Sequence, residues 1–436
     1  MSPDAGRRDD GVPAPPAEVI SPPPASELRA LRARGRLRGT LALLGPAFVA
    51  AVAYVDPGNF ATNISGGAQF GYLLVWVIVT ANLFAMVVQY LSAKTGIATG
   101  RNLPELCREH FPRPATWGLW VQAELVAIAT DIAEFVGAAI ALNLLFGIDP
   151  LTSGFITAAV AFAILAMQTR GYRRFELVIT GLLGVVFGGF VVDLLQVDVD
   201  PGGVAAGLVP RFDGTESVLL AVGILGATVM PHVVYLHSAL TQRRVPAADD
   251  AERREILRFQ RIDVVVAMGL AGFINVTMLV VAAALFHESG RTDVESIEGA
   301  HAGFEALLGG GAALAFGIAL LASGLSSSSV GTYAGQVVMQ GFIDRRIPLF
   351  LRRAITMAPS LVVLGLGWDA TDTLVISQVV LSFGIPFALV PMILLTRRPD
   401  VMGTFVNRRG TTMLASVIAA VVIALNGFLV FETLVG

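Results

Sequence analysis

Apolar segments long enough to cross a bilayer recur along almost the whole chain, with short polar connections between them. A membrane-spanning helix needs roughly 20 apolar residues. The candidate segments lie at residues 43–70, 72–95, 117–146, 152–168, 176–196, 215–241, 262–287, 309–342, 353–367, 372–396 and 411–434, of which the fourth and ninth are short. The pattern therefore predicts an all-α integral membrane protein with 11 transmembrane helices.

The basic residues test this division. If the amino terminus is cytoplasmic and the spans alternate, all but two of the 30 Lys and Arg residues fall on the cytoplasmic side, and the exceptions are Arg211 and Arg291. Cytoplasmic loops of membrane proteins have an excess of basic residues. One span more or fewer would place the basic residues of all later loops on the opposite side, and the excess on the cytoplasmic side would be lost. We therefore expect a cytoplasmic amino terminus and a carboxyl terminus outside.

The amino-terminal segment differs from the rest of the chain. Residues 1–28 are rich in Pro, Ala and polar residues, without the apolar core of a signal peptide, and an arginine cluster follows at positions 29, 32, 34, 36 and 38. We interpret residues 1–40 as a disordered cytoplasmic tail and 41–436 as a single transmembrane domain. The chain is 55% hydrophobic and 14% charged, which excludes an ordinary soluble protein, and its single cysteine, Cys107, excludes an intramolecular disulfide.

The first span is interrupted in its middle by Asp56-Pro57-Gly58-Asn59. Proline removes one helical hydrogen bond and clashes with the preceding turn, and glycine weakens the helix further. Unpaired backbone at membrane depth is tolerated only inside protein or beside a water-filled cavity, and a charge there indicates a functional site. The alternative is a kinked packing helix in which Asp56 is paired.

The sixth span is interrupted in the same way, at residues 227–232, which read Ala-Thr-Val-Met-Pro-His. Spans one and six are five apart and therefore enter the membrane from opposite sides. Two broken helices in corresponding positions indicate an inverted-repeat transporter with its site near the midplane. The repeats would cover about 43–196 and 215–396, with 411–434 as an additional helix. Two independent proline kinks are the alternative.

The two breaks offer a mixed set of metal ligands. Asp56 provides an anionic oxygen, Asn59 a neutral oxygen and Met230 a thioether, and unwinding frees backbone carbonyls near Ala53 and Ala227. Oxygen alone would suit sodium, magnesium or calcium, whereas a thioether favours softer transition metals. The set predicts that manganese, iron, cobalt or cadmium is accepted and that calcium and magnesium are disfavoured. Methionine is also a common core filler, so Met230 could pack only.

A second group of polar residues lies in the third span. Glu124, Asp131 and Glu134 are seven and three residues apart and share one helix face. Carboxylates in an apolar span need partners, a cavity or protons. Burial and mutual repulsion favour the protonated form of at least one of them, and His232, beside the second break, can titrate near neutral pH. A proton path and a static salt-bridge network are both open at this point.

Asp-Pro-Gly-Asn in the first span together with Met-Pro-His in the sixth resembles the Nramp family of proton-coupled divalent metal transporters. The similarity covers about 40 to 435 and includes GRNLPEL at 100–106, ATDIAEF at 129–135, GATVMPHVVYLHS at 226–238 and SSSSVGTYAGQVVMQGF at 326–342. The chain departs from the family pattern at Gln340, where an acidic residue is common. The resemblance implies a LeuT-like fold of five plus five helices with helices 1 and 6 broken.

The resemblance also implies roles for particular residues. The metal ligands would be Asp56, Asn59, Met230 and the carbonyls of Ala53 and Ala227, with Gln378 approaching the ion in some conformations. Protons would pass from Asp56 past His232 to Asp131 and Glu134, with Glu124 on the same face, and on toward Arg353. Thr228, Asn275 and Asn82 match positions that close the outer side, although hydrogen bonding between helices explains Asn82 and Asn275 equally well.

We therefore expect a symporter of the bacterial cytoplasmic (inner) membrane that imports Mn²⁺, with Fe²⁺, Cd²⁺ and Co²⁺ also accepted, driven by protons and not acting as an enzyme. No cofactor, nucleic acid or obligate protein partner is expected. The alternatives are an organic-substrate symporter on the same fold, a membrane hydrolase with paired aspartates, and a passive channel. His237 could be a gate or a packing residue, of which packing is favoured, and Ser326–Ser329 is interpreted as a small-residue packing stretch.

Overall fold

The structure is a computed structural model that describes residues 44–169, 172–242, 244–292, 294, 296–345 and 347–435. The predicted tail at 1–40, with its arginine cluster, lies outside the described residues. Within them the regular structure is helical, without a strand. The helices are α3 Pro46–Ala53, α4 Pro57–Phe70, α5 Val75–Thr99, α6 Leu103–His110, α7 Arg113–Phe146, α8 Pro150–Thr169, α9 Tyr172–Leu194, α10 Pro201–Ala206, α11 Gly214–Thr228, α12 Pro231–Thr241, α13 Asp250–Ala282, α14 Ile297–Leu308, α15 Gly310–Ile343, α16 Leu349–Leu366, α17 Ala370–Thr396, α18 Pro399–Met402 and α19 Arg409–Val435, with short turns of other helix types at Gly71–Leu74, Ala283–His287 and Gly403–Phe405.

Helices occupy each predicted span, and the first and sixth consist of two helices each, α3 with α4 and α11 with α12. In the described ranges, 8 helical stretches are long and apolar enough to cross a membrane, of which Pro57–Thr99 combines α4 and α5. The fourth predicted span is occupied by α8, of which the stretch Pro150–Ile164 is apolar but shorter than these eight. The all-α class is confirmed, whereas the number of 11 spans stays a prediction.

The clearest difference in bounds concerns the seventh span. The predicted span starts at 262, but α13 begins at Asp250, after the N-cap residue Asp249, whose Oδ1 accepts a hydrogen bond from the Glu252 backbone N–H at 2.8 Å. An aspartate at this position satisfies one of the free N–H groups of a helix start. A hydropathy scan detects the apolar part of a helix and not the polar turns that continue it.

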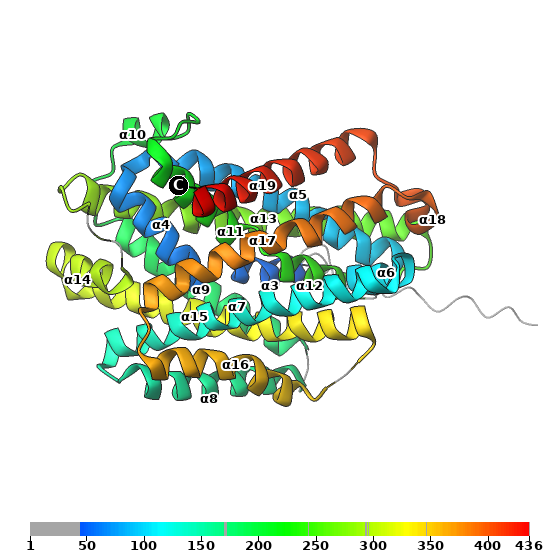
Figure 1. The fold of residues 1–436 in the computed structure, drawn as a ribbon, viewed down its shortest axis with the longest axis horizontal. Helices are drawn as coiled ribbons and strands as arrows, with labels where there is room; N and C mark the ends of the chain where they lie inside the picture. Colours follow the sequence, from blue (N-terminus) through cyan, green and yellow to red (C-terminus); the bar gives the residue numbers. More distant parts are fainter. Residues whose placement is uncertain are drawn as a thin grey trace, which may run out of the picture.

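The broken helices lie inside a bundle of longer helices (Figure 1). The long helices α7 and α15 pack along each other, α8 and α16 cover one side, and α19 lies on the opposite side. Large apolar side chains such as Phe155, Val362 and Met413 are exposed on the outer helices. This exposed apolar surface is what a protein surrounded by lipid presents.

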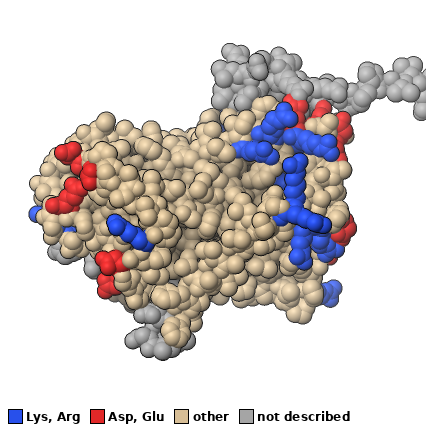
Figure 2. All heavy atoms as spheres, turned by 90° about the horizontal axis from the view of Figure 1, so that it is seen from above, with Lys and Arg blue, Asp and Glu red and all other residues tan. Residues whose placement is uncertain are grey.

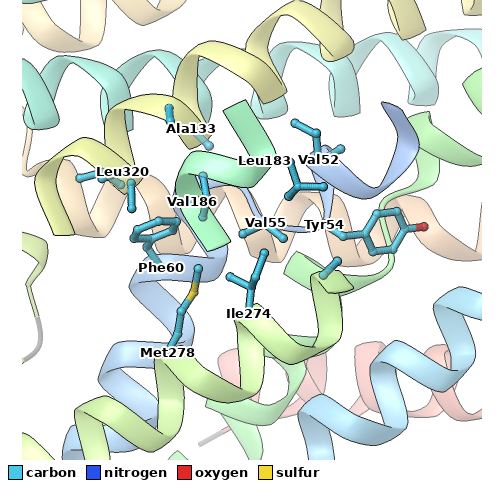
Figure 3. Packing of buried hydrophobic residues seen from close by; sticks show 14 of the residues in the cluster. Val52, Tyr54, Val55, Phe60, Ala133, Leu183, Val186, Ile274, Met278 and Leu320 are labelled. Carbon is cyan, nitrogen blue, oxygen red and sulfur yellow. The ribbon is translucent and has the colours of Figure 1, made fainter. Parts of the chain in front are cut away.

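The main apolar core packs around the first break (Figure 3). Tyr54 and Val55, which connect α3 to α4, lie beside Leu183 and Val186 of α9 and Ile274 of α13. Gly137 of α7 and Gly67 of α4 allow close helix approaches, because an added Cβ would lie 2.1 Å from Pro57 Cβ and 2.3 Å from the Leu279 carbonyl oxygen, respectively. The polar break is therefore enclosed by packed side chains.

A candidate metal site at two helix breaks

At the first break, Asp56 and Asn59 hold each other at the start of α4. The Asn59 backbone N–H donates to Asp56 Oδ1 at 2.8 Å, and the Asp56 backbone N–H donates to Asn59 Oδ1 at 3.3 Å. This reciprocal arrangement is a capping box in which Asn59 takes the place usually occupied by Glu or Gln. Both side chains are completely buried, so a carboxylate and an amide are fixed in the interior at one helix start.

The backbone carbonyls at the break divide into satisfied and free groups. Asn275 Nδ2 donates to the Tyr54 carbonyl at 2.8 Å, and Ser323 Oγ donates to the Val55 carbonyl at 2.6 Å. The residue four positions after Ala53 is Pro57, which has no N–H to donate. The Ala53 carbonyl therefore lacks its helical donor and is available for a cation.

The second break repeats this backbone arrangement without the polar side chains. Helix α11 ends at Thr228, and Met230 is the N-cap of α12 with no side-chain cap. Pro231 stands four positions after Ala227, so the Ala227 carbonyl also lacks its helical donor. The Met230 side chain is completely buried.

Helix α17 brings the two breaks together through Gln378. Gln378 Nε2 donates to Asp56 Oδ2 at 3.4 Å, and its side chain lies over Gly58, where an added Cβ would be 1.7 Å from Nε2. The Gln378 backbone carbonyl approaches the second break, 2.7 Å from the position of a Cβ on Gly226. The phenol of Tyr54 also interacts with the backbone of Met230. The predicted ligands thus come from one place in the fold.

The chemistry of this place suits a cation. Gln378 Oε1 is a buried acceptor without a hydrogen-bond donor among the described residues, and Asn59 Nδ2 is likewise unpartnered. Buried polar groups are normally paired, so an unpartnered amide oxygen beside a buried carboxylate indicates a functional role, and of the two groups the Gln378 oxygen is the one that suits a cation. No group of three or more His, Cys, Asp or Glu gathers in the described ranges. A metal at the breaks would rely on the mixed oxygen and sulfur set.

The carboxylates of α7 have different surroundings. Glu124 accepts two hydrogen bonds from Arg352, at 3.1 and 2.7 Å, and Asp131 pairs with Arg353 at 2.9 Å. Both Glu134 oxygens are buried, and in the part of the chain that is described Glu134 forms no ion pair; the Ser327 hydroxyl is the hydrogen-bonding group beside it. Two of the three predicted carboxylates are thus paired, and the third is not.

Two residues place this carboxylate group near the metal site. His232 Nδ1 lies 3.3 Å from Thr130 Oγ1 on α7, and His232 Nε2 is buried without a described partner. Gly331 of α15 faces both Glu134 and Asp131, because an added Cβ would lie 2.9 Å from Glu134 Oε2 and 3.6 Å from Asp131 Oδ1. The residues predicted for a proton path are therefore neighbours in space.

The sequence model of the Nramp family, described as Natural resistance-associated macrophage protein-like, matches residues 47–432. The chain belongs to the Nramp family. Two curated relatives are both called "Divalent metal cation transporter MntH". The one from Deinococcus radiodurans is 51% identical over 98% of each chain, and the one from Bacillus subtilis is 55% identical over 91% of this chain and 93% of its own. These are names of transporters and not of enzymes.

Solved structures show the same fold. A variant of the Eremococcus coleocola manganese transporter superposes with a TM-score of 0.82 at 33% identity, covering 89% of this chain and 86% of its own. The nucleobase-cation-symport-1 family transporter MHP1 superposes with a TM-score of 0.61 over 88% of each chain. At 16% identity this second likeness shows the fold alone. This Nramp chain therefore has the predicted LeuT-like fold.

The predicted gate residues of this Nramp chain do not form one hydrogen-bonded group. Thr228 Oγ1 donates within its own helix to the Ile224 carbonyl at 2.6 Å, and Asn275 bonds Tyr54, as described above. Asn82 packs on α13 at Gly272, where an added Cβ would lie 2.2 Å from Asn82 Nδ2. The gate assignment stays a prediction, and Asn275 has the clearest structural role, at the first break.

A buried polar chain that leads away from the metal site was not predicted. Gln89 Nε2 donates to Tyr54 Oη at 2.5 Å, and Gln89 Oε1 lies 2.8 Å from His237 Nδ1. His237 Nε2 lies 3.4 Å from Gln260 Nε2, which donates to Asp263 Oδ2 at 2.8 Å. The interpretation of His237 as a packing residue is therefore wrong, because both nitrogens of its buried ring lie within hydrogen-bond distance of the side-chain amides of this polar chain.

The far end of this polar chain anchors the start of α3. Asp263 accepts hydrogen bonds from the backbone N–H groups of Gly45 at 3.0 Å and Ala47 at 2.9 Å. Nearby, Arg244 pairs with Glu176 at 2.9 Å. A carboxylate in a predicted apolar span was the available sequence signal for Asp263, since such a charge needs partners.

The serine stretch of α15 also does more than pack. Ser328 binds the Arg353 guanidinium through its side chain and through its carbonyl, the latter at 2.9 Å, and Thr332 Oγ1 accepts from the same group. The Gln340 carbonyl accepts from Arg108 Nη1 at 3.1 Å, a bond that does not depend on which side chain position 340 has.

Proposed function

We propose that this chain is a proton-coupled secondary transporter that imports divalent transition metals by alternating access, with Mn²⁺ as substrate and Fe²⁺, Cd²⁺ and Co²⁺ also accepted. It would work in a bacterial cytoplasmic membrane with its amino terminus inside. The observation that supports this most is that two helix breaks, one with Asp56 and Asn59 and the other with Met230, are linked through Gln378 and both leave an alanine carbonyl without its helical donor. The names of the curated relatives agree with it.

The ligand set accounts for selectivity. Asp56 supplies the only charge among the proposed ligand side chains, Asn59 and the two carbonyls supply neutral oxygens, and Met230 supplies sulfur. Calcium and magnesium prefer oxygen only, and magnesium gives up its water reluctantly. A buried thioether therefore lowers the relative affinity for these abundant ions and favours softer metals.

The surroundings of α7 support proton coupling rather than a wholly static network. Burying a carboxylate without a partner is costly unless it is neutral. Glu134 forms no ion pair in the described structure, whereas Asp131 is paired with Arg353. We infer that Glu134 holds a proton in this state and that Asp56, His232 and Asp131 pass protons toward it. The Asp131–Arg353 ion pair would then break when Asp131 takes up a proton and re-form when Asp131 releases it.

The structure supports alternating access through the burial of the site. Asp56, Asn59, Met230 and Gln378 are all 0% exposed, so this arrangement is closed to solvent. Metal release to the cytoplasm would require α3 to move, and the polar chain from Tyr54 to Asp263 holds α3 at both of its ends. Opening would break these bonds.

Metal uptake into proteoliposomes tests the proposal. Purified full-length protein is reconstituted with a pH-sensitive dye inside, and Mn²⁺ is added outside under an inward proton gradient. We expect uphill Mn²⁺ accumulation with acidification of the lumen, little Ca²⁺ or Mg²⁺ entry, and loss of both signals in Asp56→Ala. Mn²⁺ entry without accumulation would indicate a passive channel. Calorimetric binding of amino acids but not of Mn²⁺ would indicate an organic-substrate symporter, and peptide cleavage in detergent would indicate a hydrolase.

A further inference from the structure

A surface groove of about 410 Å³ lies between α5, α13 and the start of α19. Most of its lining is apolar, and its polar side chains are those of Tyr90, Arg261 and Thr411. The lining residues are Met86, Val87, Tyr90, Arg261, Gly410, Thr411 and Leu414. The groove is lined by other helices than those on which the side-chain metal ligands lie, which are α4, α12 and α17. None of the roles described above uses it.

Arg261 is held in position at this groove by Tyr90. The Arg261 guanidinium carbon lies 5.1 Å from the centroid of the Tyr90 ring, and Arg261 Nη2 donates to Tyr90 Oη at 3.2 Å. Arg261 is exposed and has no carboxylate partner among the described residues. A guanidinium that is oriented but unneutralised presents its remaining donors to an incoming anion.

More positive charge surrounds the same place. Arg258 is one helical turn from Arg261 on the same side of α13, and Arg408 and Arg409 directly precede Gly410. All three are exposed, and none forms an ion pair within the described part of the chain. Lys and Arg side chains gather at one end of the molecule, as Figure 2 shows. The groove thus combines a basic mouth with an apolar body.

We propose that this groove binds an anionic phospholipid of the cytoplasmic leaflet, with the headgroup phosphate on Arg261 and one acyl chain along Met86, Val87 and Leu414. A free phosphate would use the basic mouth and leave the apolar body empty. A zwitterionic lipid would fill the body and gain less from the arginines. Basic pockets between helices on the cytoplasmic side suit acidic headgroups. Only the choice of leaflet rests on the proposed orientation.

The lipid would contact the outer side of the polar chain that anchors α3. Tyr90 follows Gln89, and Arg261 follows Gln260, so on each helix the groove residue and the polar-chain residue are adjacent and point in different directions. A lipid that bridges α5 and α13 at this level would hold the two helices that carry Gln89 and Gln260. The site therefore lies where it could affect transport without touching the metal.

Native mass spectrometry of the delipidated full-length protein tests this site, with dioleoyl phosphatidylglycerol as the anionic probe and dioleoyl phosphatidylcholine as the zwitterionic one. We expect the first bound phosphatidylglycerol to be tighter than phosphatidylcholine and to weaken about fivefold in Arg261→Gln, the effect of one arginine at a membrane surface. Arg254→Gln is the matched control, since Arg254 is an exposed arginine of the same helix that lies over Phe405.

Leu414→Trp fills the groove without changing its charge and should weaken phosphatidylglycerol binding. If Arg261→Gln fails to fold, this variant tests whether the lipid occupies the groove, and unchanged binding would overturn the proposal. Each variant is compared with the parent by gel filtration and thermal unfolding. Equal affinity for the two lipids, or an Arg261→Gln variant that binds phosphatidylglycerol as the parent and Arg254→Gln do, would overturn the proposal. Loss of binding in the Arg254→Gln control as well would also overturn it, because the effect would then be general surface charge.

Discussion

The two helix breaks have the same backbone plan and opposite surroundings. At the first, Asp56 and Asn59 cap α4 reciprocally, and Asn275 and Ser323 reach in from α13 and α15 to satisfy carbonyls. At the second, Met230 begins α12 with no side-chain cap. The first break is thus held by polar bonds from several helices, whereas the second presents a sulfur atom and a free carbonyl.

This difference suggests a division of work. A charged and bonded break is stiff, and it provides the part of the site that any divalent cation needs. The second break contributes less binding energy and discriminates between metals through the softness of its sulfur. Substitutions at the first break should therefore abolish transport or destabilise the fold, and substitutions at the second should change which metals pass.

The largest expected effect is that of Asp56→Ala. Removing the one anionic ligand should lower Mn²⁺ uptake by more than about 100-fold, beyond the 10–100-fold typical of residues that only support a ligand. Uptake of radioactive Mn²⁺ into proteoliposomes measures it. Asp149→Ala is the matched control, because Asp149 Oδ1 also accepts from a backbone N–H at a helix start, that of Thr152 at 3.0 Å, but is exposed. Substantial Mn²⁺ uptake by Asp56→Ala would end the assignment of this break as the metal site.

The bonds that hold the first break predict a stability effect. Ser323→Ala leaves the buried Val55 carbonyl without its donor, and it should lower the free energy of unfolding by about 1–3 kcal/mol. Thermal unfolding in detergent measures the change. Ser326→Ala is the control, since Ser326 Oγ donates to Ala322 of its own helix at 2.6 Å and should matter less. Equal stabilities would mean that the break is not held from α15.

At the second break, Met230→Ala should change selectivity. We expect Cd²⁺ affinity to fall roughly tenfold, equivalent to about 1.4 kcal/mol, with a smaller loss for Mn²⁺ and with Ca²⁺ newly transported. Competition uptake measures all three ions. Met268→Ala removes a buried methionine of α13 instead and should leave the ranking unchanged. If Ca²⁺ exclusion survives in Met230→Ala, the sulfur is not the selectivity element.

The unpaired carboxylate of α7 gives the smallest and most specific prediction. Glu134→Gln removes the proposed proton carrier without adding bulk, so metal uptake should become less dependent on pH while metal binding persists. Uptake measured between acidic and neutral pH tests this. Glu124→Gln, which affects a carboxylate paired with Arg352, serves as the comparison. An unaltered pH dependence in Glu134→Gln would favour the static network.

The sequence predicted the breaks because their signal is local. Pro57 and Pro231 stand beside polar or flexible residues inside apolar segments, and each removes the helical donor of the carbonyl four residues earlier. Proline alone does not suffice, because Pro386 lies inside the continuous helix α17, and the Ser382 carbonyl that it leaves accepts a hydrogen bond from Asn426 Nδ2 at 2.8 Å. The pairing of the two breaks needed only the order of the spans. The number of spans stays a prediction, because the 8 helical stretches that are long and apolar enough to cross a membrane in the described ranges do not include α8 or α16, and one of them, Pro57–Thr99, joins α4 and α5.

The polar chain from Tyr54 to Asp263 could not be predicted in this way. Gln89, His237 and Gln260 come from three helices that are distant in the sequence, and no spacing within one helix relates them. The same applies to the choice of partners on α16, where Arg352 takes Glu124 and Arg353 takes Asp131. Such pairs depend on how helices are rotated against each other, which the sequence pattern of helices that are apolar on every side does not specify.

The most direct test of the central claim is anomalous X-ray diffraction from crystals of the full-length protein soaked in Mn²⁺. The two breaks should bind one ion together. We predict a single strong peak within coordination distance of an Asp56 carboxylate oxygen and of the Met230 sulfur. A peak among Asp131 and Glu134 with none at the breaks would contradict the account.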